Sequence, residues 1–382
     1  MIKRLGDICT FVGGGTPSKK NPDFYKGSIP WATVRDMNVR VIKTTEHSIT
    51  PDAVQQSATN IIPKGEVVIS THVGLGKVCF LGQDTAINQD LKAVIPNGEL
   101  SRRYLYYWFI SKADELIANG KGATVKGVTL DFVKNLKIQV LPGREQEVVS
   151  DTLDKVNHII ELTDSQVTRL DQLVKSRFVE MFGGFGNPKH LPICRVGEVI
   201  DAIDPHPSHR TPPTVKEGVP YVGVAECDRK TGTIKFDCAR IVAQEVLDEH
   251  KSRYAIEQGD FLIGKIGTIG KPFFLPSNQT YVLSANTVLV KPRRSLVEPQ
   301  FLKIQFENQF IEHQIASNAK STSQPAFGMN KVRDLRMLNP PLALQREFAA
   351  FVAKVDKLAF AARQRRDVAK QLYRAKIQEF FG

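Results

Sequence analysis

The sequence predicts an α+β protein in which two small mixed α/β domains are joined by two long antiparallel helices forming a coiled coil, with an internal pseudo-twofold repeat. Three observations predict this fold. The two halves of the 382 residues match each other, each half begins with short β-branched runs, and each half ends in a long heptad pattern. We expect the domains at residues 1–142 and 183–341, and the helices at 143–182 and 342–382.

The repeat consists of short matching phrases separated by sequence that diverges freely. The matched pairs are Arg4–Ile8 with Arg195–Val199, Ile29–Val34 with Val219–Val224, Lys64–Leu81 with Gln258–Leu275, Val133–Leu136 with Val332–Leu335, Gln146 with Gln345, and Phe178–Gly183 with Ile377–Gly382. What the halves share therefore indicates scaffold, and what differs between them indicates specificity.

The first part of each half carries short apolar runs bounded by Gly, Pro and Asn, a pattern typical of strands in a small sheet. One helical stretch follows in each half, around residues 102–118 and 299–317. The expected strands are at residues 66–71 and 77–81 in the first half and at 261–264 and 288–290 in the second.

A long helix is expected to end each half, because apolar positions alternate at steps of four and three over about 35 residues without internal Gly or Pro. Each helix could instead pack on its own domain, but this length at equivalent repeat positions favours pairing between the two. The seam positions are Val149, Leu153, Val156, Ile160, Thr163, Val167, Leu170 and Val174 in the first helix and Phe348, Val352, Val355, Ala359, Ala362, Arg366, Ala369 and Tyr373 in the second. A Gly/Pro linker, Phe182–Lys189, follows the first helix.

The charge is distributed unevenly along the chain. Residues 144–181 contain five basic and eight acidic side chains, whereas residues 343–381 contain nine basic and four acidic, and opposite net charges favour association. The remaining parts, 1–143 and 182–342, have net charges of +6 and +4, so most of the total of +12 lies there. Such surfaces suit a polyanionic partner such as DNA.

The composition, 42% hydrophobic and 24% charged, is that of an ordinary folded protein. No stretch has the ~18 uncharged apolar residues that a membrane-spanning helix needs, and no apolar segment follows the basic residues of the N-terminus. The five scattered cysteines form no C-x-x-C pair, which disfavours a disulfide framework or a thiolate metal site. We expect a cytoplasmic protein.

Four motifs suggest catalysis or ligand binding but lack the context it requires. Phe182–Gly186 spells F-x-G-x-G but follows a helix rather than a strand, and Asn339–Leu342 lacks the aromatic residue of an N-P-P-aromatic motif. The turns ending in Lys77 and Lys271 are not followed by the Ser or Thr of a phosphate loop. His206–His209 has two histidines but no third ligand. We find no catalytic residues and expect no metal.

Taken together, the duplicated phrases resemble the specificity (S) subunit of a type I restriction-modification system over essentially the whole chain. The phrases that carry the resemblance, besides the paired glycine-lysine turns, are Gly14–Ser18, Gly27–Trp31, Lys175–Phe182, Gln146 and Gln345. In the second half, Asp204–Pro212 stands where the first half has Gly14–Ser18, so this loop departs from the pattern.

The resemblance implies that residues 1–142 and 183–341 are target-recognition domains of a non-catalytic subunit. Its partners would be double-stranded DNA, two methylation (M) subunits and, in the restricting complex, restriction (R) subunits, without any membrane association. It implies no cofactor in this chain, with S-adenosylmethionine held by the methylation subunit. The subunit would read a bipartite, asymmetric target and direct partners that methylate adenine or cleave DNA.

The divergent polar loops supply our candidate DNA-binding residues, with Lys and Ser expected mainly at phosphates and Arg, Asn and Gln at base edges. In the first domain they are Thr16, Ser18, Lys19, Lys20, Arg35, Asp36, His72, Lys77, Asn88, Gln89, Lys121 and Lys126. In the second domain they are Ser208, His209, Arg210, Thr211, Lys265, Lys271, Asn286, Lys320, Ser323 and Gln324.

Two other functions are weighed against this one. A stand-alone DNA methyltransferase or nuclease is disfavoured by the missing cofactor turn and catalytic motif, and a scaffold protein without a DNA role is disfavoured by the basic domains. The long helices, about 50 Å each at 1.5 Å per residue, would set the gap between the two half-sites.

Overall fold

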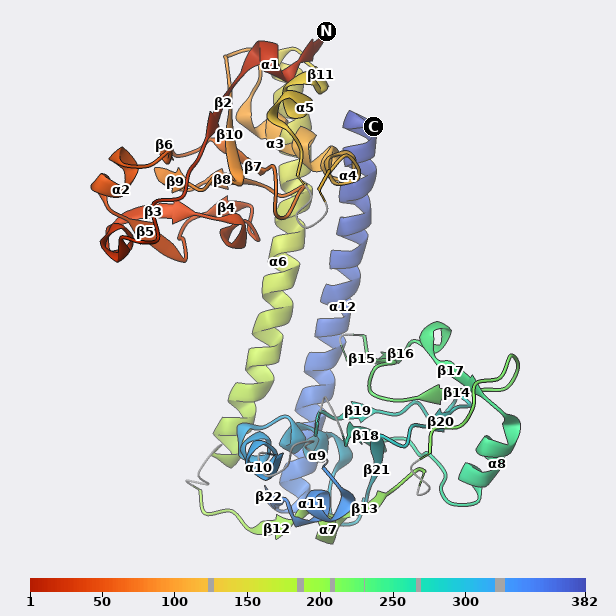
Figure 1. Ribbon diagram of the computed structural model, residues 1–382. Coiled ribbons are helices and arrows are strands. Elements are labelled where there is room, and N and C mark those ends of the chain that lie inside the picture. The colour runs from red at the N-terminus through yellow and green to blue at the C-terminus, as the bar shows by residue number, and fades with distance from the viewer. Residues whose placement is uncertain (123–126, 184–188, 207–209, 230, 266–268, 320–326) are drawn as a thin grey trace. The chain divides into compact units, whose positions relative to one another are not determined.

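A computed structural model of the chain describes residues 1–122, 127–183, 189–206, 210–229, 231–265, 269–319 and 327–382 (Figure 1). The chain divides into two units. The first comprises Met1–Ser165 with Ala362–Gly382, and the second comprises Gln166–Ala361. Each unit therefore combines a mixed α/β region with a segment of each long helix.

The first unit contains a five-stranded sheet, a four-stranded sheet and a terminal strand pair. The five-stranded sheet has the order β2-β10-β7-β8-β4, the four-stranded sheet has the order β5-β3-β9-β6, and β1 pairs with β11. The strands are β1 (Ile2–Arg4), β2 (Cys9–Gly13), β3 (Ile29–Ala32), β4 (Val41–Ile42), β5 (His47–Ile49), β6 (Asn60–Ile62), β7 (Val67–Ser70), β8 (Val78–Leu81), β9 (Thr85–Ile87), β10 (Leu91–Pro96) and β11 (Lys137–Gln139). The expected strands at 66–71 and 77–81 are β7 and β8.

Short helices complete the first unit: α1 (Leu5–Ile8), α2 (Pro51–Gln55), α3 (Arg102–Ser111), α4 (Ala113–Ala118), α5 (Leu130–Asn135) and the 3-10 turns η1 (Pro22–Tyr25) and η2 (Val34–Asp36). Residues 104–109 of α3 are all buried, so this helix enters the core with aromatic side chains on every face. The single helix expected over 102–118 is divided, because Lys112 leaves the helical conformation (φ −93°, ψ 5°) between α3 and α4.

The second unit repeats much of this plan. It has a four-stranded sheet of order β13-β21-β18-β19, a three-stranded sheet of order β17-β14-β20, and the pairs β12–β22 and β15–β16. The strands are β12 (Ile193–Arg195), β13 (Ile200–Ile203), β14 (Val219–Val222), β15 (Cys227–Asp228), β16 (Thr233–Ile234), β17 (Arg240–Val242), β18 (Phe261–Gly264), β19 (Phe273–Phe274), β20 (Val282–Leu283), β21 (Thr287–Pro292) and β22 (Arg336–Leu338). The expected strands at 261–264 and 288–290 are β18 and the middle of β21.

The helices of the second unit are α7 (Val196–Val199), the 3-10 turn η3 (Phe236–Cys238), α8 (Gln244–Lys251), α9 (Pro299–Phe306), α10 (Gln309–Ala319) and α11 (Met329–Asp334). The helix expected over 299–317 is also divided. α9 ends at Phe306 with Glu307 as its C-cap, and α10 begins at Gln309. The side chain of Asn308, just before α10, accepts from the amide of Phe310 at 3.0 Å. Asn is favoured at such starts because its side chain satisfies a free backbone amide.

The two long helices are α6 (Gly143–Phe182) and α12 (Leu342–Phe381), within a residue of the bounds expected from the heptads. Every expected seam position is buried or half-buried. In the first unit, Val149 and Leu153 near the start of α6 share a core with Tyr373, Ile377 and Phe380 near the end of α12. The two segments in this unit therefore run antiparallel.

The second unit shows the reciprocal packing. Phe178 and Phe182 at the end of α6 contact Phe348 near the start of α12, with ring centroids 5.6 and 5.5 Å apart. Arg177 of α6 also forms an ion pair with Glu347 of α12 at 3.0 Å. No helix in the described ranges combines the length and apolar character that crossing a bilayer requires.

A buried glutamine joins each mixed region to its helix. Gln146 accepts from the amide of Ser101 at 2.8 Å and donates to the carbonyl of Leu141 at 2.8 Å. Gln345 accepts from the amide of Glu298 at 2.9 Å and donates to the carbonyl of Pro340 at 2.8 Å. The glutamines matched in the sequence are thus matched in structure and use main-chain partners.

Candidate nucleic-acid interface

The turn between β9 and β10 brings several candidate residues of the first unit together. Its first residue, Asn88, is buried, and its side-chain amide donates to the Asp90 carboxylate at 3.2 Å while its carbonyl accepts from the Asp90 amide at 3.2 Å. Thr71 supports the turn by donating its amide and hydroxyl to the Asp90 carbonyl at 2.9 and 3.2 Å. The exposed Gln89 accepts from the Thr16 hydroxyl.

A cleft of about 520 Å³ lies against this turn. Aromatic side chains line part of it: Trp31 lies 5.8 Å from Tyr25 and 6.4 Å from His47 between ring centroids. Asn88 and Asp90 supply polar groups, and the other lining residues are Lys19, Thr33, Val34, Arg35 and Val73. The cleft therefore combines a flat apolar face, hydrogen-bonding groups and cations, which suits a nucleotide.

Other candidates hold the loops around the cleft. The Asp36 carboxylate caps η2 by accepting from the amide of Thr33 at 2.8 Å and also accepts from the amide of Glu46 at 2.9 Å. Arg35 forms an exposed ion pair with Glu46 at 3.4 Å. The Lys77 ammonium donates to the side chain of Asn38 at 2.7 Å and to the carbonyl of Val34 at 3.3 Å.

The remaining candidates of the first unit lie at the surface. Ser18, Lys20, His72 and Lys121 are exposed, and a ring nitrogen of His72 lies 3.8 Å from the Asp90 carboxylate. Lys121 forms an isolated bridge with Gly127. Lys126 lies outside the described residues.

The second unit has an equivalent turn between β20 and β21. Asn286 is exposed, while Lys265 beneath it is buried, 8% exposed. The Lys265 ammonium forms an ion pair with Asp204 at 2.8 Å and donates to the carbonyl of Ala285 at 3.1 Å. Because both ion-pair partners are largely shielded, Lys265 stabilises the turn from inside the domain, and its expected contact with DNA stays a prediction.

The other candidates of the second unit are less closely grouped. Lys271 is half-buried and forms an ion pair with Glu312 of α10. Arg210 and Thr211 are exposed. Ser208, His209, Lys320, Ser323 and Gln324 lie outside the described residues.

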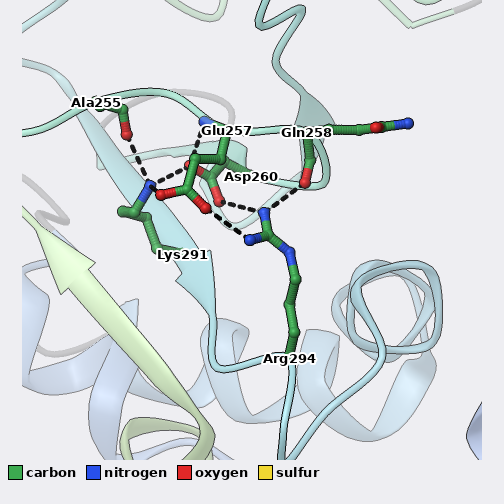
Figure 2. A network of polar contacts seen from close by, with 6 residues as sticks. All are labelled: Ala255, Glu257, Gln258, Asp260, Lys291 and Arg294. Atoms are coloured by element: carbon green, nitrogen blue, oxygen red, sulfur yellow. Dashed lines mark hydrogen bonds and ion pairs between the residues drawn. The ribbon is translucent and has the colours of Figure 1, made fainter.

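A buried carboxylate in the second unit is held by two cations (Figure 2). Asp260 is 1% exposed, and its carboxylate lies 2.6 Å from the Lys291 ammonium and 3.7 Å from the Arg294 guanidinium. Arg294 also pairs with Glu257 at 2.6 Å, and together with Lys291 it holds the pKa of the Glu257 carboxyl below its usual value. This network fixes the entry to β18 and leaves its two cations already paired.

Asp90, Trp31 and His47 also line the cleft, although the sequence does not predict them as DNA contacts. Trp31 belongs to a phrase read as scaffold, and Asp90 directly follows the selected Asn88 and Gln89. The pairing of β3 with β9 and of β14 with β20 places Asp90 opposite Asn286 of the second repeat. The spacing of the matched phrases Lys64–Leu81 and Gln258–Leu275 would instead place it opposite Ser284, so the sequence alone does not identify it.

A family model described as "Type I restriction modification DNA specificity domain" matches residues 1–172. Residues 1–172 are therefore similar to a type I restriction-modification DNA specificity domain. The cleft and the β9–β10 turn lie within the matched residues 1–172, as does the start of α6.

The curated proteins to which this chain is similar include specificity subunits. The chain is 34% identical over 160 residues to the type I restriction enzyme EcoR124I/EcoR124II specificity subunit of Escherichia coli, covering 40% of each chain. It is 29% identical over 192 residues to the MjaIX specificity subunit of Methanocaldococcus jannaschii, covering 48% of this chain and 44% of that one. The matches thus span less than half the length of these relatives.

Solved structures extend the similarity in fold beyond residues 1–172. The S subunit of a type I restriction-modification system from M. genitalium covers all of this chain and 96% of its own, with a TM-score of 0.61 and 13% identity. A chain of another type I R-M system covers all of this chain and 97% of its own, with a TM-score of 0.57 and 18% identity. Type I S subunits therefore share the mixed α/β fold of both units.

Proposed function

We propose that the whole chain is the DNA specificity subunit of a type I restriction-modification complex. The observation that carries the proposal is the repeated turn, because the β9–β10 and β20–β21 turns rest on matching strands but present different side chains. A protein that reads two different half-sites needs this combination of common scaffold and divergent surface. The specificity-subunit names of the relatives support it.

In this proposal residues 1–142 and 183–341 are the two target-recognition domains, and residues 143–182 and 342–382 form one antiparallel coiled coil that relates them by a pseudo-twofold axis. The antiparallel packing of α6 and α12 segments inside each unit supports the coiled coil. The target would be bipartite and asymmetric, because the divergent turns cannot read the same bases.

The candidate DNA contacts gain support from charge and placement. Lys19 and Arg35 lie on the rim of the cleft, where each could reach a phosphate or a base edge. Net charges of +6 and +4 on the parts outside the long helices provide the attraction to DNA that does not depend on sequence.

Exposed apolar side chains on the long helices support binding of two methylation subunits. In the first unit Ile159 of α6 and Leu372 of α12 are about half exposed, and in the second unit so are their repeat equivalents, Leu358 and Leu173. Repeated exposed apolar positions suit two copies of one partner. Restriction subunits would join this assembly, and the chain itself would have no catalytic role.

We further propose that this chain needs no cofactor and that S-adenosylmethionine is held by the methylation subunit. Phe182, at the start of the F-x-G-x-G motif, ends helix α6 and packs on Phe348, whereas the cofactor turn of a methyltransferase follows a strand.

Three measurements test the proposal, two on the purified chain and one on its mixture with a methylation subunit. We expect binding to mixed-sequence duplex DNA whose affinity falls steeply between 50 and 200 mM salt, measured by fluorescence anisotropy. We also expect native mass spectrometry to show two copies of a type I methylation subunit per chain. Stoichiometric binding of S-adenosylmethionine to the chain alone, measured by calorimetry, would contradict the non-catalytic role.

A further inference from the structure

Asp90 and Asn286 occupy the same place in the two repeats. The first residue after β9 and the first residue after β20 each donate the backbone amide to the end of the parallel strand alongside: Asn88 to Ala32 at 3.0 Å, and Ser284 to Val222 at 2.7 Å. Two residues later, the carbonyls of Asp90 and Asn286 accept from the amides of Thr71 and Lys265. Four backbone contacts therefore superimpose the two turns residue by residue, so Asp90 matches Asn286.

Both turns are held rigidly from below. The first is fixed by Asn88 and Thr71, as described above, and Lys92 donates to the carbonyl of Gln89 at 2.9 Å. The second is fixed by Lys265, and the amide of Ala285 donates to the Tyr221 hydroxyl at 2.8 Å. The supporting side chains differ between the two turns, but the backbone conformation is the same. We infer that this conformation serves DNA recognition, because a preorganised backbone positions the side chain of Asp90 or Asn286 accurately.

The side chains at this position, exposed in Asn286 and partly exposed in Asp90, differ in hydrogen-bonding capacity. Asp90 lines the cleft, and one of its carboxylate oxygens accepts from Asn88, which leaves the other facing His72 at 3.8 Å. Asn286 is exposed, and no hydrogen bond within the described residues involves its side chain. A carboxylate can only accept, whereas a carboxamide both accepts and donates.

These capacities match different bases in the major groove. Cytosine presents an amino donor without a neighbouring acceptor, which suits a carboxylate. Adenine presents an amino donor beside the N7 acceptor, which would repel a carboxylate but pairs with both groups of a carboxamide.

We propose that Asp90 and Asn286 are equivalent specificity-determining residues, with Asp90 reading a cytosine in one half-site and Asn286 reading an adenine in the other. This inference rests on the proposed DNA-reading function. The inference goes beyond that function by naming one base in each half-site and the residue that reads it. The two residues occupy equivalent positions in the repeat.

Selection from a randomised duplex library tests the inference. The full-length chain and its variants D90N and N286D are incubated with the library, and the bound DNA is sequenced. For D90N we expect one position of the first half-site to shift from cytosine to adenine, and for N286D one position of the other half-site to shift from adenine to cytosine, each by roughly ten- to hundredfold. The half-site that is not targeted should stay unchanged in each variant.

Matched controls carry the same chemical changes elsewhere in each unit: D52N in α2 and N278D before β20, both at exposed positions. Both should select the wild-type motif. A wild-type motif that D90N and N286D leave unchanged, in variants that still bind DNA, overturns this inference and leaves the proposed function standing. A wild-type chain that enriches no motif overturns the proposed function as well.

Discussion

Glu66 in the first unit and Asp260 in the second are buried carboxylates at equivalent repeat positions, yet different elements neutralise them. Glu66 pairs with Arg102 at the start of α3 through two hydrogen bonds of 2.6 and 2.8 Å. Asp260 is approached by Lys291 of β21 and by Arg294 beyond it. The repeat therefore preserves the buried charge while its partner moves, because a buried carboxylate requires a cation but not one particular position.

A second difference lies where the mixed regions meet the long helices. Asp154 of α6 accepts from Arg40, Arg103 and Tyr107, and Arg40 also lies over the ring of Tyr106 at 5.4 Å. The repeat equivalent of Asp154 is Ala353, at the later offset of 199. The first unit thus has a charged connection to its helix at a position where the second unit has an alanine.

Replacing Asp154 with Ala should produce the largest difference in stability between the two units. We expect a loss of about 3 kcal/mol in the stability of the first unit, because two guanidinium groups and a tyrosine hydroxyl lose their acceptor. Hydrogen exchange measured by mass spectrometry should show faster exchange in α3 and β8 and unchanged exchange in the second unit. D151A is the control, since Asp151 bonds only Arg103 among these groups, and it should cost less than about 1 kcal/mol.

Removing a cation beside each buried carboxylate tests how strongly Glu66 and Asp260 depend on their partners. R102A should destabilise the first unit by about 2 kcal/mol, since Glu66 is 4% exposed and loses both hydrogen bonds, although the half-exposed Arg102 site admits water. K291A should cost less, because Asp260 keeps Arg294 and an amide bond from Glu257 at 2.8 Å.

Urea denaturation checks these two values, and the double variant E66Q/R102A is the control. It should recover most of the loss, because no charge is then left buried. Equal losses in R102A and K291A would show that the second cation of the Asp260 network contributes nothing.

Acid should weaken the second unit before the first. His250 is buried, and it is linked to His206 at 3.0 Å and to Tyr254 at 2.9 Å. Burial, the adjacent His206 and the nearby Arg253 all lower the pKa of His250, whereas Glu249 raises it. The net effect is a pKa of about 4. Because the folded pKa lies below the unfolded value of about 6.5, stability is complete above pH 6.5 and is lost as the pH falls toward 4.

At pH 5 this linkage amounts to about 2 kcal/mol. Hydrogen exchange at pH 7 and pH 5, corrected for intrinsic rates, should show the loss in α8 and β20. H250Q should remove the pH-dependent part, whereas H158Q, on the exposed face of α6, should retain it. The first unit follows at lower pH, since hydrogen bonds from Tyr107 and Arg40 outweigh burial and lower the pKa of Asp154.

Replacing Lys77 or Lys271, the lysines of the two glycine-lysine turns, should have the smallest effect. The sequence predicts phosphate contacts for both Lys77 and Lys271, but Lys77 bonds uncharged oxygens, whereas Lys271 is paired with Glu312. K77A should lower the salt dependence of DNA affinity by about one counterion, and K271A by less, without change in sequence preference. Equal slopes for K77A and wild type would assign Lys77 a role in the turn alone.

The long helices and the strands β7, β8, β18 and β21 could be predicted closely because their sequence patterns are regular. Alternation by four and three located α6 and α12, and the apolar run of β18 was found at its observed bounds. The breaks after α3 and α9 were missed because apolar periodicity continues across Lys112 and Glu307, and only the local backbone and caps divide the helices.

Much of the candidate site could not be predicted, since residue type does not reveal burial. Lys265 was selected for its charge, yet its ammonium is enclosed by Asp204 and Ala285. Asp90 was passed over although it lies in the same turn as Asn88, because its position in the cleft depends on the parallel pairing of β3 with β9.

The buried glutamines of the helix entries have a consequence for how such chains can change. Gln146 and Gln345 hold a mixed region through peptide groups, and the residues they bind, Ser101 and Glu298, have unlike side chains. Ser101 and Glu298 each still cap the helix that follows, accepting from the amides of Tyr104 and Phe301. A junction built on the backbone sets few demands on the sequence beyond it. An entire domain could therefore be exchanged by recombination at these points while the helices, and whatever assembles on them, are inherited intact.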